Sequence, residues 1–344
     1  MKRINVAICG FGRIGQQIAE LLLNRSTYYK QKYQIDARLV GVCNSSSGLI
    51  DQEGLQASKW LDKTQYQAGL TEQKFLEQVQ ADVIIETGPS DYVTGGKGLF
   101  YLNYALTHSM NAIAVSKGAL VVEGKKLINL AHQHNKKLFF SGATAAALPT
   151  VDLFEYNLAG CQILEIEGVF TGTTNFILND MLQHECAFTE SLEKAQARGI
   201  AEPNSSFDVD GWDTAAKITI LANTVLGADV KIQDIPRQGI SHVTADHIRD
   251  WKKGNVIPRL VGFIHIKNQQ IQTGVELRLV PANHPFAHLQ GSNKCIRVLT
   301  QEMGEFVVSG GASAPLATAA AALKDFELMR LCCTNLASKA YSAI

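Results

Sequence analysis

One short stretch of the chain gathers residue types that carry acid–base chemistry. Glu202, Asp208, Asp210, Asp213 and Lys217 lie within sixteen residues. Asp213 and Lys217 are four residues apart, so on a helix they share one face, where an exposed ion pair contributes only about 0.3 kcal/mol. That helix is apolar on nearly every side, which favours a cleft over an exposed surface. There the ammonium group can polarise a carbonyl and donate a proton to it.

A second candidate lysine follows a predicted strand. Lys117 comes directly after the apolar run Ala112–Val115 and Ser116. Open α/β sheets bind their ligands at the carboxyl ends of parallel strands. Lys117 is therefore a candidate for an active site, although its position alone also fits an ordinary exposed lysine.

A glycine-rich turn with the spacing GxGxxG lies between a predicted strand and a predicted amphipathic helix. The first glycine of such a turn allows a tight bend, the second lets a pyrophosphate approach the backbone, and the third lets the helix pack closely on the strand. The N–H groups at the start of the helix then face the phosphates. The sequence therefore predicts a dinucleotide-binding site. Its residues are Gly10, Phe11, Gly12, Arg13, Ile14 and Gly15.

The residues after the second strand bear on the choice between NAD and NADP. An acidic residue there would hydrogen-bond the ribose 2′-hydroxyl of NAD and repel a 2′-phosphate. Instead the strand ends at Cys43 and continues into Asn44, Ser45 and Ser46, with neither an acid nor an arginine. Because Asn and Ser can donate hydrogen bonds to a phosphate, we expect a weak preference for NADP over NAD.

The first 150 residues alternate short apolar runs with amphipathic stretches, as parallel βαβ units do. The predicted strands are Asn5–Cys9, Ala37–Cys43, Val83–Ile85, Ala112–Val115 and Leu138–Phe140. Helices are predicted over residues 14–23, 98–107 and 124–134. This pattern predicts an α/β fold with an N-terminal Rossmann-type, doubly wound parallel sheet. We expect it to form a dinucleotide-binding domain over residues 1–150.

From about residue 150 the pattern changes. Helices are predicted over residues 174–183, 189–198 and 213–226, and a closing helix over residues 317–331. The predicted strands are Ile163–Phe170, Leu260–Ile266, Ile271–Leu279, Ile296–Leu299 and Phe306–Ser309. Separated by polar turns, these strands predict an antiparallel or mixed sheet. A second, α+β domain is therefore expected over residues 151–309.

The composition excludes several classes of protein. The 344 residues include 32 Lys and Arg against 32 Asp and Glu, so the chain lacks the excess positive charge that binds nucleic acids and anionic membranes. No segment is apolar over the roughly 18 residues of a membrane span. The seven cysteines show no CxxC pair and no spacing typical of a zinc cluster or a disulfide framework. We therefore expect a protein of the reducing cytoplasm.

Several segments, in order along essentially the whole chain, carry a resemblance to a known family. The most specific are Gly168–Leu178, Ala197–Pro203 and Phe207–Lys217. Others are the GxGxxG turn, Asn44-Ser45, Ser116-Lys117, Leu148-Pro149, His284-Pro285 and Gly310–Ala312. Together they resemble the homoserine dehydrogenase family. The chain ends soon after the closing helix, so we expect the form without an aspartokinase or an ACT-type regulatory domain.

The resemblance implies an enzyme of threonine and methionine biosynthesis that interconverts L-homoserine and L-aspartate 4-semialdehyde with NAD or NADP. It implies Lys217 and Lys117 as catalytic lysines, with Asp213 orienting Lys217, and leaves the division of acid and base roles open. A homodimer formed through the second domain is also implied, as is a first domain completed by residues 310–344. The substrate-binding residues that it implies are Gly172, Thr173, Thr174, Glu202 and Asp208. The cofactor-binding residues that it adds to the turn are Asn44, Ser45, Ser46, Thr87, Gly88, Ser116, Lys117 and Gly311.

Two segments depart from the family pattern. Thr171 stands where the family usually has Asn, just before Gly-Thr-Thr. Residues 141–149 lack the Glu that many relatives carry before Leu-Pro, which puts the family's monovalent-cation site in question. The backbone carbonyls of Thr144, Ala146 and Leu148 remain as candidate ligands for such a cation.

Two other functions stay open at the level of sequence. A related NAD(P)-dependent reductase could act on another small aldehyde or keto acid, because the fold tolerates changes of substrate. The other alternative is a catalytically idle dinucleotide-binding sensor, but a sensor would have no use for the proton donors Lys117 and Lys217.

Overall fold

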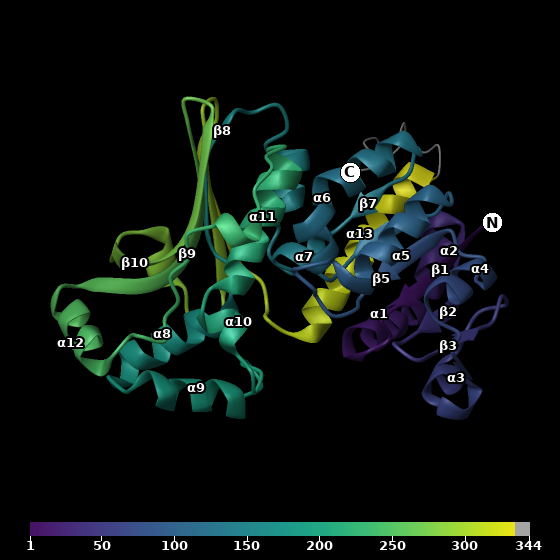
Figure 1. Cartoon of the computed structure of the whole chain (residues 1–344), viewed down its shortest axis with the longest axis horizontal. Helices are drawn as coiled ribbons and strands as arrows, with labels where there is room; N and C mark the ends of the chain where they lie inside the picture. The colour runs from purple at the N-terminus through teal and green to yellow at the C-terminus, as the bar shows by residue number, and fades with distance from the viewer. Residues whose placement is uncertain (334–344) are drawn as a thin grey trace. The chain divides into compact units, whose positions relative to one another are not determined.

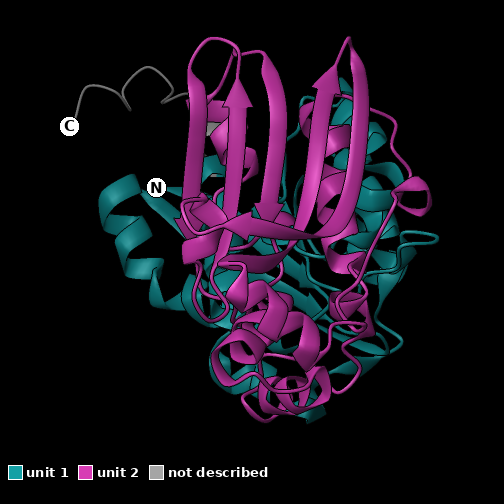
Figure 2. Ribbon diagram, turned by 90° about the vertical axis from the view of Figure 1, so that its left-hand side faces the viewer, with its two compact units in different colours: residues 1–143, 315–344 teal, residues 144–314 magenta. Residues whose placement is uncertain are grey.

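The computed structural model describes the backbone of residues 1–333, with side chains to residue 329 (Figure 1). The chain divides into two compact units, coloured separately in Figure 2. Unit 1 consists of residues 1–143 and the C-terminal helix that begins at Pro315. Unit 2 consists of residues 144–314. Within the described chain, no helix combines the length and the apolar character that crossing a membrane requires.

Unit 1 is built on a seven-stranded sheet in the order β4-β3-β2-β1-β5-β6-β7. Its strands are β1 Lys2–Cys9, β2 Ile35–Cys43, β3 Ser47–Ile50, β4 Gln67–Ala68, β5 Val83–Glu86, β6 Asn111–Ala114 and β7 Leu138–Phe139. The five strands predicted from the sequence are present and pair in parallel with one another, which confirms the doubly wound sheet. The other two, β3 and β4, form an antiparallel edge that the sequence pattern did not predict. Each has at most four residues, too few to show alternation.

The helices of unit 1 include the C-terminal helix, which lies beside the first helix (Figure 1). They are α1 Arg13–Asn24, α2 Ser26–Tyr33, α3 Ala57–Leu61, α4 Glu72–Gln78, α5 Gly96–Thr107, α6 Gly118–Gln133 and α13 Pro315–Cys333, with a 3₁₀ turn Lys63–Gln65. Ile18 and Leu22 of α1 share one buried core with Phe326 and Met329 of α13. A parallel sheet is buried on both faces, so this returning helix supplies apolar cover that the N-terminal segment alone lacks. A further short helix, α7 Ser141–Thr144, stands at the boundary of the two units.

Unit 2 contains a five-stranded sheet in the order β10-β9-β8-β11-β12 (Figure 2). Its strands are β8 Ile163–Val169, β9 Val256–Lys267, β10 Gln270–Pro281, β11 Lys294–Thr300 and β12 Gly304–Gly310. All neighbouring strands are antiparallel, which decides between the antiparallel and mixed arrangements left open by the sequence. Tight turns join β9 to β10 and β11 to β12, as only antiparallel neighbours allow.

One helix of unit 2, α11, is buried along most of its length. The helices of the unit are α8 Gly172–His184, α9 Phe188–Ala197, α10 Ser206–Val209, α11 Trp212–Val225 and α12 Ala245–Lys253, with short helical turns Leu153–Asn157, Ile232–Asp234 and Pro285–His288. Every residue of α11 from Thr214 to Asn223 is buried. The helix lies so close to β9 that a Cβ atom on Gly262 would come within 2.7 Å of Thr214 and 2.8 Å of Ile218. This close packing explains why the α11 sequence is apolar on nearly every side.

Candidate active site

The glycine-rich turn joins β1 to α1 in unit 1 and is held by the strands beside it. The amides of Gly10 and Phe11 both donate to the carbonyl oxygen of Cys43, at 2.9 Å each. The hydroxyl of Thr87 donates to the carbonyl oxygen of Gly10. Gly10 has a φ of +100°, and a Cβ atom there would lie 2.5 Å from the amide nitrogen of Gly88. Only glycine fits at this position, because the backbone angle and the contact both exclude a side chain.

The next part of the turn is open toward a ligand. A Cβ atom on Gly12 would meet nothing within 4 Å. Helix α1 begins at Arg13, and no side chain caps its first N–H groups. At the third glycine, a Cβ atom on Gly15 would lie 3.0 Å from the carbonyl oxygen of Gly10, so helix and strand approach closely. These features fit a pyrophosphate bound at a helix N-terminus.

The other predicted residues of the turn differ in what they can offer a ligand. Phe11 is 5% exposed and packs edge-on against Trp60, so its side chain belongs to the core and only its backbone serves the turn. Ile14 is half-buried and packs against the same core. The side chain of Arg13 is exposed and can approach a phosphate.

Beneath the turn, a buried carboxylate ties together two loops that carry predicted cofactor residues. Glu86, the last residue of β5, is fully buried. It accepts hydrogen bonds from the amide of Gly88 at 2.7 Å and from the hydroxyl of Ser116 at 2.6 Å. Burial raises the pKa of Glu86 above its usual range, although these hydrogen bonds act in the opposite direction. Sequence reasoning missed Glu86, whose only signal is an acidic residue at the end of an otherwise apolar strand.

The segment after β2 forms a tight turn organised by Asn44. The side-chain oxygen of Asn44 accepts hydrogen bonds from the amides of Ser46 and Ser47, at 2.9 Å each. Its side-chain amide donates to the hydroxyl of Ser47 at 3.1 Å. Ser45 and Ser46 are exposed on this turn. The hydroxyl of Ser46 also donates to the side-chain oxygen of Asn44, at 3.2 Å. Asn44 therefore shapes the turn, on which Ser45 and Ser46 remain accessible to a ligand.

Lys117 lies between β6 and α6, beyond the carboxyl end of a parallel strand as the sequence predicts. It is the N-cap residue of α6 and is partly exposed. Its amide donates to the hydroxyl of Ser90 at 2.9 Å. The loop that carries Lys117 is thus held by Ser90 on one side and, through Ser116, by Glu86 on the other.

In unit 2, the predicted lysine and aspartate form a buried ion pair on α11. Lys217 Nζ lies 2.5 Å from Asp213 Oδ2 and donates to the carbonyl oxygen of Phe170 at 2.8 Å. Lys217 is only 8% exposed. Asp213 lies in the first turn of α11, where the helix dipole also favours a negative charge. The side chain of Asp213 is 14% exposed, so the pair is not an exposed surface ion pair, and Lys217 is largely shielded from bulk water.

Two threonines extend this ion pair into a chain of hydrogen bonds. The hydroxyl of Thr171 donates to Asp213 Oδ2 at 2.9 Å and lies 3.0 Å from the hydroxyl of Thr214. Because the proton of Thr171 is used on Asp213, the hydroxyl of Thr214 is the donor to Thr171. Thr171 therefore supplies a donor to the carboxylate at the position where the family usually has Asn. Thr214 gave no signal in the sequence, since it is one more small residue on a buried helix.

A second acidic residue is held by the same end of α8. The hydroxyl of Thr173 donates to Asp208 Oδ2 at 2.6 Å, from a side chain two residues after Thr171. The N-terminus of α8 is thus hydrogen-bonded to Asp208 of α10 and to Asp213 of α11. Carboxylates so fixed can orient a cationic group, such as the amino group of an amino acid.

The remaining predicted substrate residues have different surroundings. The hydroxyl of Thr174 is bound to the carbonyl oxygen of Thr171 at 3.1 Å, so it stabilises the start of α8. A Cβ atom on Gly172 would lie 2.8 Å from the carbonyl oxygen of Ser292, so no side chain fits there. Glu202 is exposed in the loop before α10, and its carboxylate has no hydrogen bond to any residue that the structure describes. The structure therefore brings Thr174 and Gly172 to the cluster but leaves Glu202 outside its hydrogen bonds.

The segment Thr144–Leu148, whose carbonyls the sequence predicts as cation ligands, is approached by an ammonium group. Lys294, at the start of β11, is 5% exposed and donates to the carbonyl oxygen of Ala145 at 2.9 Å. Gly311 packs on the same segment, since a Cβ atom there would lie 2.9 Å from the amide nitrogen of Leu148. Sequence reasoning missed Lys294, because a lysine at the start of a strand is most often exposed.

The fold and these groups define a class of enzyme. A dinucleotide turn on a parallel sheet and a buried lysine–aspartate pair are the parts of an NAD(P)-dependent oxidoreductase. The family model for the NAD-binding domain of homoserine dehydrogenase matches residues 10–141, and the model for homoserine dehydrogenase itself matches residues 149–326. The chain therefore belongs to the homoserine dehydrogenase family, which confirms the resemblance seen in the sequence.

Individual relatives agree with this assignment over nearly the full chain. Homoserine dehydrogenase of Methanocaldococcus jannaschii is 32% identical over 94% of this chain and 97% of its own. The NAD(+)-dependent homoserine dehydrogenase of Pseudomonas canavaninivorans is 27% identical over 94% of this chain and 96% of its own. Among solved structures, an Archaeoglobus fulgidus protein assigned as a homoserine dehydrogenase is 28% identical, with a TM-score of 0.85 over 95% of this chain and 99% of its own.

Proposed function

We propose that this protein interconverts L-homoserine and L-aspartate 4-semialdehyde with a nicotinamide dinucleotide. The buried Lys217–Asp213 pair carries the proposal. Reduction of an aldehyde needs a proton donor beside the carbonyl oxygen, and an ammonium held out of water by a carboxylate suits that task. The nucleotide turn supports the same reaction, because the open space at Gly12 and the uncapped start of α1 fit the cofactor's pyrophosphate.

The substrate would be held by its charged amino group. Asp208 offers a carboxylate that Thr173 already orients, and Glu202 offers an exposed carboxylate in the neighbouring loop. Two carboxylates can fix the orientation of the substrate's ammonium group, in addition to attracting it. Thr173, Thr174 and the backbone at Gly172 would line the site beside them.

Lys217 is assigned the proton transfer. When bound, the reduced nicotinamide supplies a hydride to the aldehyde carbon. Lys217 polarises the carbonyl oxygen and then gives its proton to the alkoxide, so the product is the neutral hydroxyl of homoserine. In the opposite direction the hydroxyl proton passes to the lysine. Asp213 and the carbonyl oxygen of Phe170 keep the ammonium in one orientation throughout.

Lys117 is the second lysine of the proposed mechanism. Its place beyond the carboxyl end of β6 is where an open α/β sheet binds its ligand, and two hydrogen bonds hold its loop. We assign it to the reacting end of the cofactor and substrate. Separate Lys117 and Lys217 variants, compared by their pH–rate profiles, divide the acid and base roles between the two lysines.

A preference for NADP over NAD is proposed from the turn after β2. The structure keeps Ser45 and Ser46 exposed there, with no acidic side chain at the end of the strand to repel a 2′-phosphate. The expected kcat/KM is higher with NADP than with NAD, at equal homoserine concentration. A higher kcat/KM with NAD would make this part of the proposal wrong.

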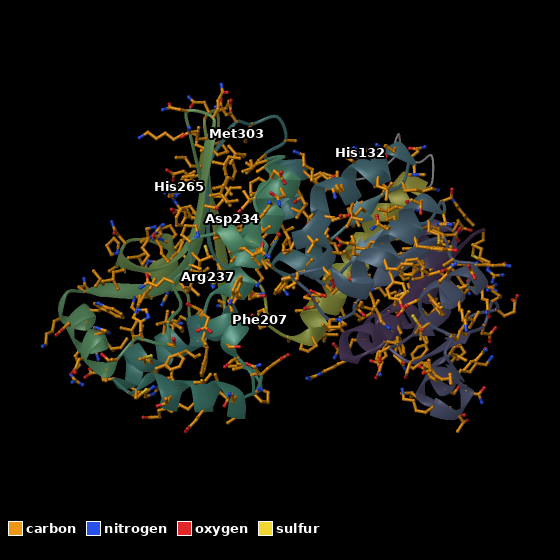
Figure 3. All side chains as sticks on the ribbon, in the orientation of Figure 1. His132, Phe207, Asp234, Arg237, His265 and Met303 are labelled. Carbon is orange, nitrogen blue, oxygen red and sulfur yellow. The ribbon has the colours of Figure 1, made fainter. Side chains whose placement is uncertain are left out.

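We propose that a homodimer forms through the face of the unit 2 sheet that carries Glu167. Glu167 is buried there between Arg278 at 2.7 Å and Arg297 at 3.0 Å, with His265 of β9 at 3.0 Å (Figure 3). Burial opposes ionisation of Glu167, but the hydrogen bonds from Arg278 and His265 outweigh it and hold its pKa below the usual range. A carboxylate that is already paired with guanidinium groups can be buried against a second copy of this chain without leaving an unpaired charge at the interface. Light scattering in solution tests the dimer.

We also propose that the enzyme works in the reducing cytoplasm. The five cysteines whose side chains the structure describes are all free thiols. Cys9 and Cys43 are in register on β1 and β2, yet they are not linked. Burial raises the pKa of Cys9 well above its usual value, which keeps that thiol protonated and unreactive.

One assay separates the proposal from its alternatives. Purified protein is mixed with L-homoserine and NADP or NAD, and reduction of the nicotinamide is followed by absorbance. Turnover of homoserine is the expected result. Turnover of a different hydroxy compound but not homoserine would identify a reductase of another small aldehyde or keto acid. Cofactor binding without turnover of any such compound would identify a sensor.

A further inference from the structure

A buried lysine of unit 2 approaches a backbone segment that could otherwise bind a metal cation. Lys294 is the first residue of β11, and its backbone is in register with Gly310 of β12. Its side chain extends to the segment Thr144–Leu148, where the ammonium donates to the carbonyl oxygen of Ala145 at 2.9 Å. With 5% of its surface exposed, Lys294 brings a positive charge largely out of water.

The same segment does not fit a free monovalent cation well. Sodium and potassium ions need several oxygen ligands, and a carboxylate is the strongest that a protein can offer them. Residues 141–149 contain neither Asp nor Glu. The ammonium at Ala145 is a further obstacle, because a metal ion bound within this five-residue segment would stand next to a like charge at low effective dielectric.

We propose that the ammonium of Lys294 is the built-in cation of the Thr144–Leu148 segment, so that this enzyme folds and works without bound sodium or potassium. The ammonium supplies what such an ion would supply: a positive charge among backbone carbonyls that draws the segment toward the sheet. Being covalently attached, it cannot be lost by dilution.

The position of Lys294 explains what this cation stabilises. Through its backbone the residue belongs to the β11–β12 pair, and through its ammonium it holds the start of unit 2. Gly311, directly after β12, packs on Leu148 of the same segment. Lys294 and Gly311 therefore fasten the Thr144–Leu148 segment to one end of the sheet at two points.

The test compares cations at equal ionic strength. Melting temperature and homoserine oxidation are measured for the full-length protein in sodium, potassium and choline chloride, choline being too large for a carbonyl site. For the wild type we expect the rate of homoserine oxidation to vary by less than about twofold among the three salts. The melting temperature should show no rise that is specific to sodium or potassium, because simple ionic screening is the same in all three. A melting temperature or rate that rises specifically with sodium or potassium would overturn the proposal.

Two variants make the test specific to the lysine. Lys294→Met removes the charge but keeps much of the length, so in choline it should melt at a lower temperature than wild type. Sodium or potassium should then raise its melting temperature, because an ion that binds only the folded state stabilises it. Lys294→Arg keeps a cation and should remain indifferent to the choice of salt.

The possible outcomes all bear on the proposal. A folded Lys294→Met protein with wild-type stability in choline and no response to sodium or potassium would contradict it. If Lys294→Met fails to fold in every salt, the wild type and Lys294→Arg provide the test. A melting temperature or rate that rises specifically with sodium or potassium in either protein would show a site for a free ion and contradict the proposal. The melting temperatures do not depend on turnover, so this result stays separate from any failure of the homoserine assay.

Discussion

The two units carry candidate functional groups of different kinds. In unit 1 the nucleotide turn is a backbone structure, in which Gly10 allows the bend and Gly12 leaves space before the first N–H groups of α1. In unit 2 the site is made of side chains, with Lys217 held by Asp213 and Asp213 held by Thr171. The turn therefore depends on shape, whereas the ion pair depends on hydrogen bonds and charge.

This difference predicts that variants in the two units fail in different ways. A backbone site loses its ligand when a methyl group blocks it, even though no charge has changed. A charged side-chain site keeps its shape after a conservative substitution but loses the proton transfer. Variants of unit 1 should therefore act on cofactor binding or on folding, and variants of unit 2 mainly on kcat.

The largest effect is expected for Lys217→Ala. Loss of a general acid lowers kcat by roughly 10²–10⁴-fold, while the nucleotide turn keeps its geometry. Steady-state kinetics should show the loss, and fluorescence titration should show that NADPH still binds with near wild-type affinity. Lys231→Ala, which removes an exposed lysine shortly after the same helix, is the matched control and should keep wild-type kcat. Near-normal kcat in Lys217→Ala would remove this lysine from the mechanism.

The next largest effect separates two glycines of the turn. At Gly10 an alanine meets both a φ of +100° and a contact of 2.5 Å with Gly88, so Gly10→Ala should lower the free energy of unfolding by about 3 kcal/mol. At Gly12 a methyl group meets open space, so Gly12→Ala should melt like wild type but raise the KM for NADP about tenfold or more. Thermal melts and cofactor titrations check both. Equal melting temperatures for the two variants would contradict the assignment of these roles.

How far the sequence predicts this structure depends on how local each feature is. The glycine turn and the lysine–aspartate spacing are set by residues within a few positions of one another, and both were predicted. Glu86 and Lys294 depend on partners far along the chain: 30 residues separate Glu86 from Ser116, and 149 separate Lys294 from Ala145. No periodicity or spacing records such contacts, because they arise only when the sheets are assembled. The short edge strands β3 and β4 escaped prediction for a related reason: they depend on neighbouring strands more than on their own residues.

A smaller effect should come from the threonine that stands in place of the family's usual Asn. Thr171→Val removes the hydroxyl that donates to Asp213 and leaves Thr214 without its acceptor. Because Asp213 then orients Lys217 less firmly, we expect kcat to fall about tenfold, equivalent to ~1.4 kcal/mol, with KM for NADP unchanged. The acid limb of the kcat profile should also move to higher pH, since a carboxylate that loses a donor is protonated more easily.

Rescue variants distinguish positioning from packing at this site. Thr171→Ser restores a hydroxyl at the same place, and Thr171→Asn restores an amide donor of the kind usual in the family. Both should recover most of the lost kcat and return the acid limb toward its wild-type position. If Thr171→Val matches wild type in kcat and in pH profile, the hydrogen bond to Asp213 has no part in positioning Lys217.

The smallest effect concerns Glu86, a fully buried carboxyl group of unit 1. Burial raises the pKa of Glu86, so the folded protein takes up a proton at a pH where the unfolded chain has released it. The resulting stabilisation is complete below the pKa of an unfolded glutamate and is lost as the pH rises through the folded value. Glu86→Gln keeps the shape and cannot ionise, so from about pH 4 to 7 its stability should improve relative to wild type as the pH rises. Melting curves of both proteins across this range measure the difference. If the difference in stability between Glu86→Gln and wild type stays constant with pH, Glu86 remains ionised in the folded protein. Unit 1 would then also hold its loops with a charged side chain.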